Sequence, residues 1–97
     1  METLHYEYEA KGHLTRRAHV GVVGSGDLEV LIEPSSSPTT QVRVRTSVDG
    51  YAHVWKAVLD RFFSRFQHAA KVEINDFGAT PGTVTLRLEQ AAEELQS

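Results

Sequence analysis

The chain lacks cysteine altogether, and none of its apolar runs approaches the length needed to span a membrane. The absence of cysteine excludes disulfides and thiolate metal sites, so any thiol chemistry must use a thiol from outside the chain. The N-terminal stretch alternates apolar and polar side chains and lacks the basic, then continuously apolar order of a signal peptide. These absences lead us to expect a cytoplasmic protein without a membrane partner.

Neither sign of charge is in large excess. Ten lysines and arginines and thirteen acidic residues are mixed along the chain and give a net charge of −3. This balance lacks the basic footprint of a nucleic-acid-binding protein. For four arginines we expect a solvated sheet face, with local gathering as the alternative: Arg16, Arg17, Arg43 and Arg45.

The length of 97 residues suffices for one modest hydrophobic core and not for two. We therefore expect residues 1–97 to form a single domain. A domain of this size also argues against a deep, enclosed active site.

Apolar and polar residues alternate along most of the chain, as they do in half-buried strands. This pattern predicts strands at residues 3–9, 15–23, 28–33, 42–48, 71–77 and 84–88. Between residues 51 and 67 a wide aromatic stripe recurs every three or four positions, which predicts a core-facing helix with Asp49 as N-cap. The predicted fold class is α+β: a mostly antiparallel sheet of about five to six strands, one long amphipathic helix packed on one face, and a short C-terminal helix at 88–95.

One short polar turn, Gly24-Ser25-Gly26-Asp27, separates two of the predicted strands. Its glycines remove bulk on both sides of Ser25, so the hydroxyl can project without crowding. A plain β-hairpin turn has the same composition and is the alternative reading. The serines of the flexible loop at residues 34–40 are alternatives to Ser25 on chemistry alone.

Known catalytic and nucleotide-binding patterns do not match this turn. The Gly-x-Ser-x-Gly elbow of hydrolases is missing, and the glycine order differs from that of dinucleotide loops. Tyr6 and Tyr8 share a face with Leu4, which favours core placement over the stacking of RNA bases. The histidines are scattered without metal-ligand spacing, so we predict surface positions and no metal site: His5, His13, His19, His53 and His68.

The segment from Gly24 to Glu33 resembles the attachment segment of the acyl carrier (delta) subunit of bacterial malonate decarboxylase, and the likeness extends over most of the chain. Residues 72–79 and 84–92 also resemble the acyl carrier (gamma) subunit of citrate lyase. In that relative the modified serine is likewise followed two residues on by aspartate, as Ser25 is followed by Asp27.

The resemblance implies that Ser25 is an anchor and that the chain has no catalytic residue. In this family a prosthetic-group transferase joins the serine through a phosphodiester to 2'-(5''-phosphoribosyl)-3'-dephospho-CoA, whose thiol holds acetyl or malonyl. The missing cysteine then makes sense, because the thiol belongs to the arm. The implied partners are the acyl transferase (alpha) and decarboxylase (beta and gamma) subunits.

The resemblance also suggests roles for the neighbours of Ser25. Gly24 and Gly26 would leave room for the transferase, and Asp27 would fix the loop through backbone amides or help to position a metal during attachment. The four arginines named above would hold the phosphates of the arm or an acidic partner surface. The alternatives are a carrier for a citrate-lyase-like complex and an unmodified protein- or RNA-binding module.

Overall fold

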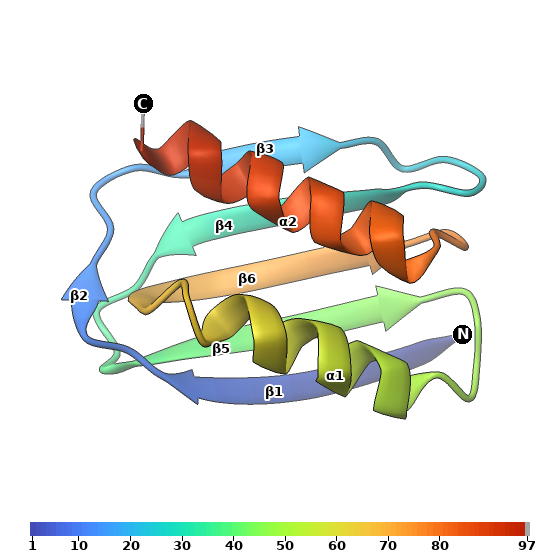
Figure 1. Cartoon of the computed structure of the whole chain (residues 1–97), viewed down its shortest axis with the longest axis horizontal. Coiled ribbons are helices and arrows are strands. Elements are labelled where there is room, and N and C mark those ends of the chain that lie inside the picture. The colour runs from blue at the N-terminus through green and yellow to red at the C-terminus, as the bar shows by residue number, and fades with distance from the viewer. Residues whose placement is uncertain (97) are drawn as a thin grey trace.

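The computed structural model describes residues 1–96, which form a six-stranded sheet and two helices that cover the same face of it (Figure 1). The strand order is β1-β5-β6-β4-β3, and β2 pairs with β6 beside this path. The elements are β1 (Glu2–Glu9), β2 (Gly12–His13), β3 (Ala18–Gly21), β4 (Leu28–Pro34), β5 (Thr39–Thr46), α1 (Ala52–Phe63), β6 (His68–Asp76) and α2 (Pro81–Gln96). None of the helices in this part of the chain is long and apolar enough to cross a membrane.

The α+β class is confirmed, but the sheet is mixed and not mostly antiparallel. The central strand β6 runs parallel to β5 and to β2, whereas it pairs antiparallel with β4. The reason is the connection between β5 and β6, which contains α1 and returns the chain to the end where β5 began. Alternation within a strand predicts the strand but not the direction of its neighbour.

The predicted strand at 84–88 is wrong, because these residues belong to α2. Val84, Leu88 and Ala91 are buried at steps of three and four residues, whereas Leu86 is 51% exposed. At 16 residues, α2 is longer than α1 with 12, so the C-terminal helix is not short. Thr80 caps it, since the Thr83 amide donates to Thr80 Oγ1 at 3.2 Å.

The start of α1 also differs from the prediction. Asp49 does not cap the helix; its carboxylate lies 3.2 Å from the N-terminal amino group of Met1. Tyr51 occupies the N-cap position without a side-chain hydrogen bond to the helix. The first turn of α1 is therefore left uncapped at the end of the sheet where β5 stops.

The core lies between the helices and the sheet, and the aromatic stripe of α1 fills much of it, as predicted. Leu59 and Phe63 are buried, and the ring of Tyr8 stacks on Phe63 with a centroid distance of 4.8 Å. The hydroxyl groups of Tyr6 and Tyr8 donate to α1, at the Ala52 carbonyl (3.1 Å) and the Asp60 carboxylate (2.8 Å). Both tyrosines therefore pack under α1, which confirms their core placement.

Candidate functional site

The loop that carries Ser25 spans residues 22–27 and joins β3 to β4. It lies at the end of the molecule where β5 and β6 finish and where both helices begin (Figure 1). Ser25 is exposed, and its hydroxyl has no hydrogen-bond partner within residues 1–96. Val22 and Val23 before it are 62% and 58% exposed. The loop thus offers a free hydroxyl beside an apolar surface.

Backbone hydrogen bonds attach this loop to the segment that follows β6. The Gly26 amide donates to the Phe77 carbonyl at 2.8 Å, and the Phe77 amide donates to the Asp27 carbonyl at 2.9 Å. Within the loop, the Asp27 amide donates to the Gly24 carbonyl at 3.1 Å and closes a tight turn around Ser25. The pairing of β4 with β6 therefore continues into the loop, up to the residue after the serine.

A side-chain ion pair fastens the same loop to α2. Arg87 donates from Nε and from its terminal nitrogen to the two carboxylate oxygens of Asp27, at 3.1 and 3.0 Å. The Leu28 amide donates to the same carboxylate at 2.7 Å. These bonds, that of Arg87 foremost, lower the pKa of Asp27 below its ordinary value. Asp27 therefore fixes the loop, and it does so through a side chain as well as a backbone amide.

Arg87 is the residue of this site that the sequence prediction missed. Read as part of a strand, residue 87 pointed away from Val84 and Leu88. On a helix, Arg87 follows Val84 by three residues and precedes Ala91 by four, so it lies along the buried face. The spacing of the small and apolar residues from 84 to 91 was the signal that could have found it.

Among the glycines, Gly21 matters most to the fold, although the sequence did not single it out. Its φ is +82°, and a Cβ placed there would lie 2.0 Å from the Leu28 carbonyl oxygen. Around Gly24 and Gly26 there is open space: a Cβ would meet nothing closer than 4.0 Å at the first and nothing within 4 Å at the second. The chain itself does not crowd either side of Ser25, and the role of the two glycines in admitting a transferase stays a prediction.

The four arginines do not gather, so the local cluster that the sequence allowed does not form. Arg43 pairs with Glu73 on the face of the sheet away from the helices, and Arg16 and Arg17 precede β3 at the end opposite the serine loop. Arg45 alone of the four lies beside the loop, in a groove of about 250 Å³ that it shares with Val23 and Phe77.

The histidines are all exposed, as predicted. Within the described part of the chain, no group of three or more histidine, cysteine or acidic side chains lies close enough to hold a metal. The carboxylate of Asp27 is engaged by Arg87 and Leu28. The arrangement is thus an anchored loop that presents one hydroxyl.

Fold and site together define a small α+β protein with an unhindered serine on a hairpin loop held by two other elements. The family model described as malonate decarboxylase delta subunit (MdcD) matches residues 15–95. A malonate decarboxylase acyl carrier protein of Azotobacter vinelandii is 50% identical over 100% of this chain and 99% of its own length. One of Pseudomonas savastanoi pv. phaseolicola is 51% identical over 98% and 97%.

A chain in the crystal structure of a Pseudomonas malonate decarboxylase hetero-tetramer in complex with malonate has the same fold. It superimposes with a TM-score of 0.92 at 49% identity, covering 98% of this chain and 99% of that chain. The protein belongs to the malonate decarboxylase delta subunit family of acyl carrier proteins.

Proposed function

We propose that this chain is the acyl carrier subunit of a malonate decarboxylase and that Ser25 is the attachment point of a 2'-(5''-phosphoribosyl)-3'-dephospho-CoA arm. The observation that carries the proposal is the exposed Ser25 hydroxyl, unpartnered within residues 1–96, on a loop fixed by Phe77 and Arg87. A transferase that works from outside needs a hydroxyl it can reach in the folded protein. This loop meets that requirement without rearrangement.

During attachment the chain contributes the nucleophile and a clear approach to it. The Ser25 O–H bond and the bond between the donor phosphorus and its leaving group break, and a bond from Oγ to phosphorus forms. The base that takes the proton belongs to the transferase in this account, because the Asp27 carboxylate is bound to Arg87. Gly24 and Gly26 keep side chains out of the path of the incoming phosphoryl group.

When bound, the arm supplies a thiol on which malonate becomes a thioester, whose carbonyl can delocalise the charge left when carbon dioxide departs. Arg45 is the residue best placed to hold an anionic group of the arm near its root. It lines the groove beside Val23, and it makes no ion pair within the described residues. A guanidinium binds phosphate oxygens through paired, charge-assisted hydrogen bonds.

The remaining roles follow from the carrier proposal. The chain itself would be non-catalytic, with residues 1–97 as one carrier domain in the cytoplasm, and acyl transfer and decarboxylation would be performed by the alpha, beta and gamma subunits. The names of the relatives favour malonate over a citrate-lyase-like complex. A module that stacks RNA bases is disfavoured because Tyr6 and Tyr8 lie beneath α1.

The absence of cysteine makes a sharp test possible, because every thiol found in the purified protein must belong to an attached group. The chain is purified from cells consuming malonate, treated with hydroxylamine to release acyl groups, alkylated with iodoacetamide, and weighed intact. We expect one alkylation per loaded chain. Before hydroxylamine treatment, the acyl mass identifies acetyl or malonyl, or else a citrate-derived group. A chain without any thiol under these conditions would contradict the carrier function.

A further inference from the structure

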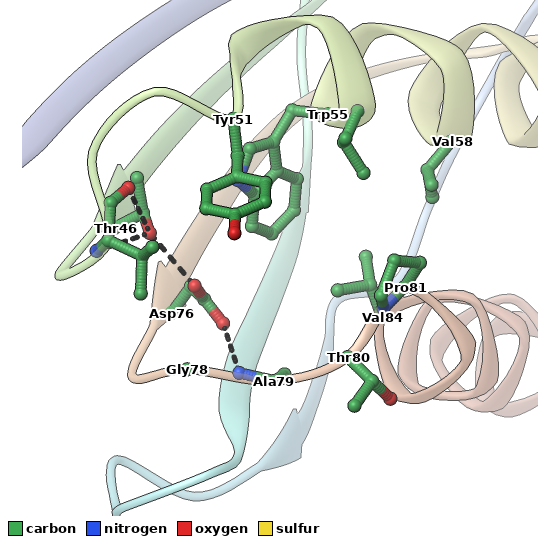
Figure 2. Close-up of a pocket in the computed structure, with 12 residues that line it drawn as sticks. Thr46, Tyr51, Trp55, Val58, Asp76, Gly78, Ala79, Thr80, Pro81 and Val84 are labelled. Atoms are coloured by element: carbon green, nitrogen blue, oxygen red, sulfur yellow. Dashed lines mark hydrogen bonds between the residues drawn. The ribbon is translucent and has the colours of Figure 1, made fainter.

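An apolar cavity of about 330 Å³ lies between the starts of α1 and α2. Figure 2 shows Tyr51 and Trp55 on the α1 side of it and Pro81 and Val84 on the α2 side. Trp55 and Val84 are buried, whereas Tyr51 at the mouth is 51% exposed. The cavity volume falls in the range of sites that bind small organic groups, roughly 300 to 1,000 Å³.

The polar groups at the base of this cavity are already satisfied by the chain. The buried Asp76 carboxylate accepts hydrogen bonds from Thr46 Oγ1 at 2.9 Å and from the Ala79 amide at 3.0 Å, two of the dashed lines in Figure 2. It therefore has bonding partners without any ligand, and most of the remaining wall is apolar. Such a cavity suits a flexible chain of methylene and methyl groups, since covering apolar surface lowers the free energy.

The cavity adjoins the serine loop. Gly78 is part of its wall, and a Cβ at Gly78 would lie 4.0 Å from the Gly26 amide nitrogen. Through the 2.8 Å hydrogen bond from Gly26 to Phe77, standard backbone dimensions place the Cα atoms of Ser25 and Gly78 about 9 Å apart at most. The attachment point and the cavity are therefore neighbours at one end of the molecule.

We propose that this cavity receives the pantetheine end of the arm carried by Ser25, an inference that rests on the proposed function. Pantetheine alone has the length of about four peptide units, roughly 14 Å when extended, and the phosphoribosyl, adenosine and diphosphate groups of the arm lie between it and Ser25, so the arm is longer than the distance from the loop to the cavity wall. Trp55 and Val84 would contact its methylene and methyl groups, and Tyr51 would cover it from solvent. The chain would thus shield the thioester between visits to partner subunits.

Because the arm is covalently attached to Ser25, even a weak affinity for this cavity is enough for the arm to occupy it. A group linked to Ser25 is held near the cavity at an effective concentration in the millimolar range, so an affinity of that order populates the sheltered state. The same weakness lets the arm leave when a partner offers a better site. The arm would therefore occupy the cavity between reactions and would still be able to reach the partner subunits.

Trp55 provides a direct probe, because it is the only tryptophan in the chain and lies in the cavity wall. Nitrogen and methyl NMR spectra of the unmodified chain and of the chain loaded by its transferase are compared, after mass spectrometry has shown the arm on the same samples. We expect shifts of the Trp55 indole and Val84 methyl signals on loading, independent of protein concentration. Shifts that grow with concentration would instead identify a second copy as the occupant and overturn the proposal.

A pair of variants on α1 sharpens the test. Val58→Phe places a phenyl ring on the cavity wall and narrows the cavity, whereas Ala57→Phe places the same ring at an exposed neighbour outside it. Loading should shift the Trp55 signal less in V58F than in the wild type and should shift it as in the wild type in A57F, with thermal unfolding recorded for both. If V58F does not fold, Tyr51→Ala tests the same wall, and the Val84 shift on loading should then decrease.

The two proposals fail in distinguishable ways. A loaded chain whose Trp55 and Val84 signals do not move overturns the cavity proposal and leaves the carrier function intact. If mass spectrometry finds no arm, the carrier function fails, and the unmodified chain is titrated with S-acetyl-pantetheine at millimolar concentration. Saturable shifts confined to the cavity would still support the binding site, and unchanged spectra would overturn it.

Discussion

Two serine-bearing loops lie at opposite ends of β4, and they differ in whether their serine hydroxyl groups form hydrogen bonds within the loop. In the loop after Pro34, the Ser35 hydroxyl accepts from the Ser37 amide at 3.1 Å, and the Ser37 hydroxyl accepts from the Thr39 amide at 3.3 Å. This loop holds itself in shape with its own side chains. In the loop at 22–27, by contrast, the stabilising hydrogen bonds are made by Asp27, by α2 and by the segment after β6. The Ser25 hydroxyl takes no part in them.

A serine hydroxyl therefore stays available when other parts of the fold, and not the serine itself, hold the loop in place. Serine side chains in turns commonly bond to nearby backbone amides, which occupies them. In the loop at 22–27 the Ser25 hydroxyl makes no such bond, because the backbone of Phe77 and the side chain of Arg87 hold the loop from outside it. Serine content alone would have favoured the other loop.

The largest effect we predict is on loading. Ser25→Ala should abolish attachment of the arm, whereas Ser36→Ala, in the exposed middle of the other loop, should leave attachment unchanged. Both variants should unfold within about 0.5 kcal/mol of the wild type, because neither hydroxyl supports the fold within the described residues. Intact mass after incubation with the transferase and urea unfolding measure the two properties. Equal loading of S25A and the wild type would refute the assignment.

The next effect is on stability. Gly21→Ala should cost at least about 2 kcal/mol, because its φ of +82° and the Leu28 carbonyl both oppose a side chain. Gly24→Ala is the matched control and should stay within about 0.5 kcal/mol, since its surroundings are open. Urea unfolding of both variants checks the pair. A G24A variant as unstable as G21A would show that the serine loop is more crowded than described.

A smaller and local effect is expected from the ion pair. Arg87→Gln removes the bidentate bond to Asp27, so the loop should open more often and the Gly26 and Phe77 amides should exchange with solvent faster. Arg65→Gln is the control, because its contact with Glu89 is longer at 3.6 Å and remote from the loop. Hydrogen exchange measured by NMR separates them. Unchanged protection in R87Q would mean that the backbone bonds hold the loop alone.

The smallest effect we predict is a pH dependence of the attachment of the serine loop. The pKa of Asp27 is lowered, chiefly by Arg87, so the contribution of this carboxylate to loop attachment is fully present above its ordinary pKa of 3.8. That contribution is lost as the pH falls through the lowered native pKa. The Gly26 amide signal should therefore change in strongly acidic solution, and in R87Q the same change should occur at higher pH. A transition at the same pH in both proteins would exclude the ion pair as its cause.

Much of the fold could be predicted from the sequence, because strands with one buried face alternate strictly and α1 shows its aromatic stripe. The error at residues 84–88 arose because Val84, Leu86 and Leu88 also alternate, and only tertiary packing decides that Leu86 faces solvent. The same error hid Arg87. The parallel pairing of β6 with β5 depends on the path of α1, which local periodicity does not encode.

For the site, the position of Ser25 could be read from its glycines and from the family resemblance, and its role as an anchor stays a prediction. Arg16 and Arg17 open the predicted strand 15–23, so their distance from the loop could be predicted, whereas the distance of Arg43 and Arg45 depends on the direction of β5 relative to β3 and β4. Arg45 stands at the end of β5 near the loop, whereas Arg16 and Arg17 stand before β3 at the far end.

The most direct test of the central claim is tandem mass spectrometry of peptides from the chain purified from its native host. We expect a phosphoribosyl-dephospho-CoA adduct on the peptide that contains Ser25 and an unmodified peptide that contains Ser35, Ser36 and Ser37. An adduct on the second peptide, or none on either while malonate is being consumed, would contradict the central claim.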